Sequence, residues 1–262
     1  MPGFPLDAML RDDVDHLVRD LKGVTPPIVT ENDLAHLPDP VRRYLIASQI
    51  VGKPRTVFAR VRLKGAFRRG GNQKWMPMVS EQYNRIDQPA RVWYAAMKFM
   101  PLLNFYVRDA YRDGEGNMYA RLTPWYRMFD QRIPELTQGE LITYLNDMFM
   151  FPSALLHESI RWEAMDDLSA RAYLTAPSGT VSAAFYFNDQ DEIVNFVAER
   201  YRTVGKSYEL NIWTTPLWDY QEVKGVRIPT QGAATWELAD GQLNYIRTTL
   251  VDIDYNLFER YG

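Results

Sequence analysis

The spacing of hydrophobic and polar positions divides the chain into a helical N-terminal part and a longer, strand-rich part. Before residue 50, apolar side chains recur every three or four positions, which is the period of an amphipathic helix. Thr30 with Asp33 resembles a capping box for a short helix, and Asp39-Pro40 is a typical helix start. We therefore expect residues 1–50 to form a helical segment that packs on the rest of the molecule.

From Arg55 the apolar period changes from 3.6 to 2, which is the alternation of a half-buried β-strand. The first strand alternates aliphatic with basic residues, so it has one core face and one face that we expect to be solvated. The basic residues are Arg60, Arg62, Lys64 and Arg68. Further strand-like runs follow at intervals of roughly 10–15 residues, with turn residues such as Asp113-Gly114 between them.

One helix interrupts the strands. Thr137 and Glu140 have the pattern of a capping box, and an apolar stripe then predicts a helix over about 138–150. The strand over 91–100 is apolar on both faces, so helices must cover both sides of it. The predicted fold is α+β: N-terminal helices, then a large curved antiparallel β-sheet with one inserted helix. This sheet is a half-barrel whose concave side can hold a ligand.

Residues 51–262 are expected to form the sheet and to make one structural domain with the helical segment, since no linker or repeat separates them. The chain has no cysteine, which excludes disulfides and thiolate metal sites. Charges interrupt the apolar positions of the N-terminus, and no window of about 18 apolar residues follows. We therefore expect a cytoplasmic protein without stable membrane insertion. A formal charge of −3 argues against a nucleic-acid partner.

Motifs for metal, phosphate or acyl-transfer chemistry are missing from the sequence. Only three histidines occur, and no two have the spacing of metal ligands. Asp252 and Asp254 share one face of a predicted strand and are interpreted as solvated surface. A phosphate-binding glycine loop and a Gly-x-Ser-x-Gly elbow are both absent. We expect no metal and no cofactor.

Several short stretches occur in a distinctive order. They are LPDPVRRYL at 37–45, WMP at 75–77 followed by EQ at 81–82, RDAY at 108–111, QGEL at 138–141, RWEAMDD at 161–167, and GVRIPT at 225–230 with Trp236. Together, over about residues 35–255, they resemble an uncharacterised bacterial family known only as a domain of unknown function. The resemblance implies a half-barrel similar to that of curved-sheet lipoprotein carriers, which bind acyl chains. It implies no established activity.

Charged residues that stand among bulky apolar ones are the candidates for a site. Burying an unpaired charge costs several kcal/mol, so such a group on the concave face must be paired, and it suits a polar ligand head or a proton transfer. Asp109 is the first candidate, because alternation places it beside Tyr111, whose hydroxyl can donate to it. The others are Glu81, Arg108, His157 and Arg200.

The first functional hypothesis is a binding protein for an apolar or aromatic small molecule, such as a lipid. Pockets for such ligands are mostly apolar with a few placed polar groups. The aromatic content of 13% and the 11 methionines agree with such a pocket. The residues predicted to contact this ligand are Trp93, Met97, Arg108, Tyr111, Trp162, Arg200, Tyr220 and Trp236.

The alternative is a metal-independent acid–base enzyme acting on a hydrophobic small molecule. Asp109 or Glu81 would be the base, His157 an acid or base, and Arg108 or Arg200 would hold an anionic group. Convergence of these side chains in one pocket favours the enzyme, and scattered positions favour the binding protein. A third hypothesis is an interaction module, in which the basic face of the first strand meets an anionic partner or membrane surface.

Overall fold

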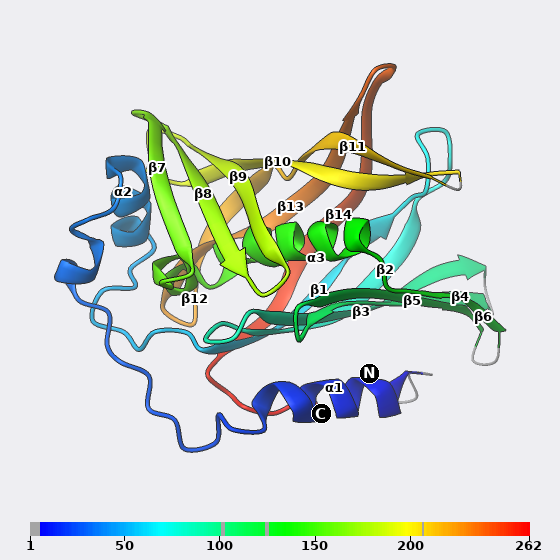
Figure 1. The fold of residues 1–262 in the computed structure, drawn as a ribbon, viewed down its shortest axis with the longest axis horizontal. Coiled ribbons are helices and arrows are strands. Elements are labelled where there is room, and N and C mark those ends of the chain that lie inside the picture. Colours follow the sequence, from blue (N-terminus) through cyan, green and yellow to red (C-terminus); the bar gives the residue numbers. More distant parts are fainter. Residues whose placement is uncertain (1–5, 101–102, 124–125, 206) are drawn as a thin grey trace.

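The protein is built around one 14-stranded sheet (Figure 1), in a computed structural model that describes residues 6–100, 103–123, 126–205 and 207–262. The strands of its first half are β1 (Phe58–Phe67), β2 (Met76–Arg85), β3 (Ala90–Met100), β4 (Leu103–Arg112), β5 (Glu115–Leu122) and β6 (Tyr126–Gln131). Those of its second half are β7 (Ile160–Asp166), β8 (Ser169–Ala176), β9 (Gly179–Phe187), β10 (Ile193–Val204), β11 (Ser207–Thr214), β12 (Leu217–Val223), β13 (Val226–Leu238) and β14 (Gly241–Tyr255).

All neighbouring strands are antiparallel, in the order β6-β5-β4-β3-β2-β1-β14-β13-β11-β10-β9-β8-β7, and β12 pairs with β13 beside this path. The sheet does not close, because β6 and β7 form its two ends. One arm, β1–β6, is a run of consecutive hairpins. It meets the other arm at the centre of the sheet, where β1 pairs with β14 from Ala59↔Tyr255 to Phe67↔Ile246.

Helices cover both faces of this sheet. They are α1 (Asp7–Val18), α2 (Asp39–Ala47) and α3 (Pro134–Asp147), together with short 3-10 turns η1 (Glu31–Leu34), η2 (Met148–Met150) and η3 (Pro152–Leu156). The predicted α+β half-barrel with N-terminal helices and one inserted helix is confirmed. The capping box at Thr30 and Asp33 is also confirmed, since Thr30 N donates to Asp33 Oδ2 at 2.7 Å. The division into a helical segment and a sheet of one domain stays a prediction.

Helix α3 lies on the concave side, between the two arms of the sheet (Figure 1). It contacts β4 and β5 on one arm and β9 and β10 on the other. At Gly116 of β5, the backbone N–H donates to Thr137 Oγ1 at 2.9 Å, and a Cβ on this glycine would lie 2.5 Å from Thr137 Cα. Only glycine therefore lets the helix approach this closely, and the position of α3 limits the space left inside the half-barrel.

The main core lies between α3, α2 and the concave face of the sheet. Aromatic rings cross this face as one row, with successive ring centroids 5.0 to 6.5 Å apart. In order, the row consists of Trp162, Phe185, Phe196, Trp213, Trp236, Tyr245 and Phe67. Edge-on and tilted contacts at these distances each add about 0.5–1.5 kcal/mol to area burial. The high aromatic content therefore builds the concave wall.

Helix α1 covers the convex face of the first arm, where Leu10, Val14 and Leu17 pack with Val92 and Tyr94 of β3. On the opposite, concave face of β3, Trp93, Ala95 and Met97 form part of a separate apolar cluster. A helix thus covers the convex face of this strand as predicted, whereas the apolar residues on its concave face pack with residues of other strands.

Two local predictions were wrong. Helix α3 starts at Pro134, which holds the first helical position, so Thr137 is inside the helix and Glu140 is no capping residue. The basic face of β1 is also not freely solvated. Helix α1 and the C-terminal residues cover this side of the sheet. Beneath them, Arg60 pairs with Asp254, and Arg62 pairs with Glu81. Among these basic residues only Lys64 is exposed.

No helix within the described residues has the length and hydropathy that crossing a membrane requires.

Candidate functional site

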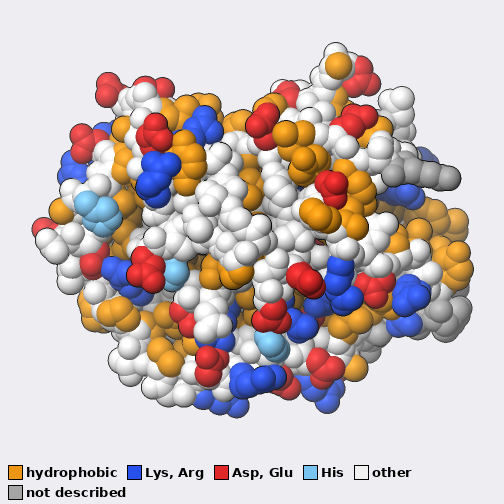
Figure 2. Space-filling view, viewed as in Figure 1, with side chains coloured by type: hydrophobic (Ala, Val, Ile, Leu, Met, Phe, Trp, Pro, Cys, Tyr) orange, Lys and Arg blue, Asp and Glu red, His pale blue; other side chains and the backbone are white. Residues whose placement is uncertain are grey.

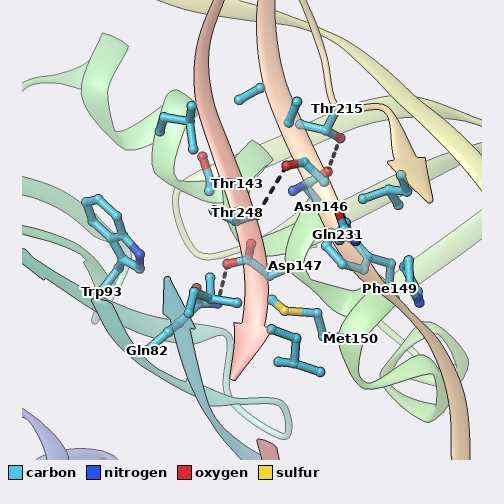
Figure 3. A pocket seen from close by; sticks show the side chains of 18 of the residues that line it. Gln82, Trp93, Thr143, Asn146, Asp147, Phe149, Met150, Thr215, Gln231 and Thr248 are labelled. Atoms are coloured by element: carbon cyan, nitrogen blue, oxygen red, sulfur yellow. Dashed lines mark hydrogen bonds between the residues drawn. The ribbon is translucent and has the colours of Figure 1, made fainter. Parts of the chain in front are cut away.

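A cavity with about 140 Å³ of open space lies between α3 and the concave face of the sheet (Figure 3). Both arms contribute to it. Its apolar lining includes Leu63, Trp93, Phe149, Met150, Trp213, Leu217, Tyr245, Ile246 and Leu250. Its polar lining includes Gln82, Arg91, Asp109, Glu140, Thr143, Asn146, Asp147, Arg200, Thr215, Gln231 and Thr248. An apolar wall with convergent polar groups is the usual composition of a small-molecule site.

Arg91 of β3 joins two acidic residues of α3 on one side of the cavity. Its Nη1 lies 2.6 Å from Glu140 Oε2, and its Nε lies 2.9 Å from Asp147 Oδ2. Gln82 of β2 donates to the same Asp147 oxygen at 2.6 Å (Figure 3). All three charged side chains are at most 8% exposed. Burial raises the pKa of Asp147 to about 6, although Arg91 opposes the shift.

Arg200 of β10 approaches the same acidic residues from the other arm. Its Nη2 lies 3.7 Å from Glu140 Oε1, and its Nε donates to the Gly139 carbonyl at 3.1 Å. Its guanidinium lies over the ring of Trp213, 5.0 Å from the centroid, and 5.7 Å from that of Trp236. These contacts hold the cation against an aromatic wall. Helix α3 is therefore tied to both arms through Glu140.

Asp109 of β4 is the carboxyl group whose partners do not balance its charge. Its Oδ1 is buried and accepts no hydrogen bond from any described residue. Burial, and then the nearby Glu140 carboxylate, raise the pKa of Asp109 to about 8, although Arg91 and Arg200 oppose the shift. A carboxyl group with this pKa is mostly protonated at pH 7, and it can both donate and accept a proton near neutrality.

The expected tyrosine donor to Asp109 is absent. Tyr111 does lie on the same strand two residues away, but its hydroxyl bonds to Ser178 Oγ at 2.7 Å. The β8–β9 turn provides this serine, and no pattern around Asp109 reveals such a long-range partner. The prediction of an inward-facing Asp109 agrees with its position in the cavity wall.

Three of the predicted acid–base and anion-binding residues lie away from the cavity. Glu81 is on the opposite face of β2, where Arg62 pairs with it at 2.9 Å. Arg108 is beneath α1 and makes two hydrogen bonds to Asp13. His157 follows η3, where its Nδ1 lies 2.8 Å from Ser159 Oγ and burial lowers its pKa. Only Asp109 and Arg200 of this set line the cavity.

The predicted aromatic contacts are likewise divided. Trp93 lines the cavity, and Met97 continues the same face of β3 within the neighbouring apolar cluster. Trp236 stacks behind the wall residue Tyr245, with centroids 6.1 Å apart. Trp162 donates to the Leu155 carbonyl, and Tyr220 donates to the Ile193 carbonyl, both outside the cavity. The assignment of ligand contacts stays a prediction.

Sequence reasoning missed Gln82, Arg91, Glu140 and Asp147. The sequence did contain a signal that Glu140 and Asp147 share one face of α3, since they recur with Thr143 at helical spacing next to the apolar stripe of this helix. This spacing places the three residues on one face of α3, but polar residues beside an apolar stripe are typical of a solvated face, so the sequence pattern did not predict their burial. Within the described residues, no group of three or more acidic or histidine side chains is arranged to hold a metal ion.

A profile of a family described as a family of unknown function, DUF6544, matches residues 27–248. The chain belongs to this family. The predicted resemblance is thus confirmed. In this DUF6544 protein the match spans α2, α3, every strand before β14 and the first part of β14, and α1 lies before it. A search of curated proteins finds no match.

Three solved structures that match this DUF6544 protein have little sequence in common with it. A domain assigned to outer membrane lipoprotein sorting from Vibrio parahaemolyticus has 9% identity and a TM-score of 0.46, over 76% of this chain and 86% of that one. A LolA superfamily protein from Nitrosomonas europaea has 10% identity and a TM-score of 0.42, over 82% and 93%. A β-barrel-like DUF1849 protein from Brucella abortus has 12% identity and a TM-score of 0.21, over 77% and 98%.

Proposed function

We propose that this protein binds a small, largely apolar or aromatic molecule in the cavity between α3 and the sheet. The observation that carries the proposal is the buried Asp109 Oδ1, which accepts no hydrogen bond from the described residues and lies in an aromatic-walled cavity. A buried acceptor without a partner costs about 1–3 kcal/mol, and a ligand donor that reaches it recovers this free energy. The dispersed positions of Glu81, Arg108 and His157 favour binding over acid–base catalysis.

The volume of the cavity limits the size of this ligand. An apolar cavity of roughly 150 Å³ accepts a benzene-sized molecule, whereas drug-sized ligands occupy pockets of about 300–1,000 Å³. With about 140 Å³, the cavity suits one ring or a short branched group and leaves the remainder of a long lipid outside. The proposal therefore favours a small aromatic ligand over a whole lipid molecule.

The charges around the cavity specify the polar group of the ligand. Three carboxyl groups (Asp109, Glu140 and Asp147) face two guanidinium groups (Arg91 and Arg200). The set is neutral while Asp109 holds its proton and becomes negative when Asp109 ionises. A ligand with an ammonium group therefore compensates the ionised form, whereas a carboxylate ligand meets an uncompensated negative charge.

We expect benzylamine to bind more tightly than toluene, and benzoate to bind least. The affinity for benzylamine should rise with pH, by up to roughly fiftyfold between pH 6 and pH 8, because the ionised Asp109 that pairs with the cation becomes more populated. Dissociation constants from ligand-observed NMR titrations would measure both effects. Native mass spectrometry of the purified protein would identify a ligand that it already carries.

A cavity-filling variant provides the control for this experiment. Thr143 lines the cavity and donates only to the Gly139 carbonyl of its own helix, so Thr143→Leu should fill the space without unfolding the protein. The matched control is Thr203→Leu at an exposed position of β10. If Thr143→Leu binds benzylamine as tightly as the Thr203→Leu protein does, the ligand occupies another site and the proposal fails.

A second candidate function, metal-independent acid–base catalysis on the same small molecule, rests on the pKa of Asp109 near 8. A group with this pKa exchanges protons readily at neutral pH, and Arg200 can hold a developing negative charge nearby. Incubating a small-molecule extract with the wild type and with Asp109→Asn, followed by mass spectrometry, tests it. We expect one metabolite pair to change with the wild type alone. Identical extracts after both incubations would leave binding as the function.

The expected cytoplasmic location stays a prediction.

A further inference from the structure

The strands of the first arm are neighbours in the order β6-β5-β4-β3-β2-β1, and the ends of β1, β3 and β5 lie beside the starts of β2, β4 and β6 at one end of the sheet. The strand register aligns these strand ends. Met78 pairs with Met97, Met97 with Phe105, Phe105 with Leu122, and Leu122 with Tyr126. We call this end of the first arm the hairpin end.

Large apolar side chains are exposed at the hairpin end. Phe99 and Met100 of β3 are 50% and 53% exposed, and Tyr126 and Met128 of β6 are 61% and 41% exposed. Strands β3 and β6 are three strand spacings apart, about 14 Å, so all four side chains lie within one end of the first arm. An exposed apolar patch of this kind marks an interaction site more often than a scattered single residue does.

The charges at the hairpin end have a single sign. Residues 66–80, 95–107 and 117–129 contain no aspartate and no glutamate, although the whole chain has a net charge of −3. Their basic residues are Arg68, Arg69, Lys74, Lys98, Arg121 and Arg127. Arg69, Lys74, Lys98 and Arg127 are exposed, and none of them forms an ion pair with a described residue. In contrast, Arg60 and Arg62, farther along β1, are both paired.

We propose that the hairpin end docks on an anionic lipid surface. Aromatic and methionine side chains enter the interface between headgroups and acyl chains, while the surrounding lysine and arginine side chains contact the anionic headgroups. Figure 2 shows hydrophobic and basic side chains together at the right-hand end of the molecule, where Figure 1 places β4, β5 and β6. The absence of acidic residues from these three segments favours a lipid surface of negative charge over a neutral one.

An apolar cluster connects the hairpin end with the cavity. Met97, Phe105 and Phe129 belong to this cluster together with Trp93 and Ile246, and the last two also line the cavity. The hairpin end and the cavity wall are therefore parts of one packed apolar cluster. The docking itself rests on the separate observations above.

Co-sedimentation of the full chain with vesicles tests the proposal. The protein should bind vesicles of phosphatidylcholine with phosphatidylglycerol and should bind those of phosphatidylcholine alone much less, and high salt should weaken the binding. Neutralising one basic residue should reduce the partition coefficient about fivefold, so Lys98→Gln with Arg127→Gln should reduce it roughly 25-fold. Phe99→Ser with Tyr126→Ser should reduce it about tenfold or more.

Matched variants on the other arm separate docking from general effects of charge and hydrophobicity. Arg161 and Met165 are exposed on β7, the edge strand at the opposite end of the strand order from β6. The variants Arg161→Gln and Met165→Ser should therefore bind vesicles as the wild type does. Equal binding to both kinds of vesicle, no binding to either, or equal losses in the β7 variants would overturn the proposal. Circular dichroism of every variant confirms that the comparison is made between folded proteins.

Discussion

Replacing Arg91 by methionine should lower the free energy of unfolding by about 3–5 kcal/mol at pH 7. Arg91 is 4% exposed and is the direct partner of both Glu140 and Asp147, so its removal leaves Asp147 buried without its cationic partner and leaves Glu140 with Arg200 alone, 3.7 Å away. Because these carboxylates anchor α3 inside the half-barrel, the cavity should be lost with the stability. Urea unfolding followed by tryptophan fluorescence measures the change.

The control for this prediction is Arg161→Met, which removes an arginine that is 65% exposed and 3.7 Å from Glu163. An exposed pair of this kind contributes at most about 1 kcal/mol. Neutralising Asp147 as well, in Arg91→Met with Asp147→Asn, should recover much of the lost stability, since Glu140 keeps Arg200 and neither carboxylate is then left without a cationic partner. Equal stabilities of Arg91→Met and Arg161→Met would show that the buried network does not hold the helix.

Asp109→Asn should become more stable than the wild type as pH rises. The folded-state pKa of Asp109, about 8, is above the value near 4 of an unfolded chain. The folded state therefore holds a proton that the unfolded state releases, so the contribution of Asp109 to stability is fully present below pH 4 and is lost as pH rises to 8. The loss is ~1.4 kcal/mol for each pH unit, on the order of 5 kcal/mol over the window at most.

The measurement is the difference in free energy of unfolding between Asp109→Asn and the wild type at several pH values. It should be near zero at pH 4 and should favour the variant by several kcal/mol at pH 9. Asp147, whose pKa is also raised, is present in both proteins and cancels. The exposed Asp240→Asn is the matched control and should show no such trend. A difference that does not change with pH would mean that Asp109 is ionised in the folded protein throughout.

The change of apolar period near residue 55 was sufficient to predict the architecture, because it reports backbone geometry that every residue of a strand shares. The two-sided apolar strand over 91–100 also indicated that both of its faces are buried, although a helix covers only the convex one in these clusters. Individual site residues depend on a finer property, the face to which each strand position points. Asp109 was assigned to the concave face correctly, since Val107 and Tyr111 on its side are both buried.

The same reasoning chose Glu81 instead of Gln82 in β2, a strand in which residues on both faces are buried. Alternation cannot distinguish two buried faces, so an error of one position moves a candidate from the cavity to the opposite side. Glu140 was interpreted as a capping residue because Thr137 stands three positions before it. Pro134 starts the helix one turn earlier, and that shift turns an expected surface group into the centre of a buried network.

The half-barrel cannot be completed until its last strand has been synthesised. Each arm consists largely of hairpins between consecutive strands, which form early, but the arms join only when β14 inserts between β1 and β13. This pairing closes a loop of almost the whole chain, and such non-local contacts are slow to form. Until then the edge of β1 is exposed to pairing with other chains. The strand that folds last thus lies at the centre of the sheet, and a chain without it would lose the junction between its arms instead of an edge.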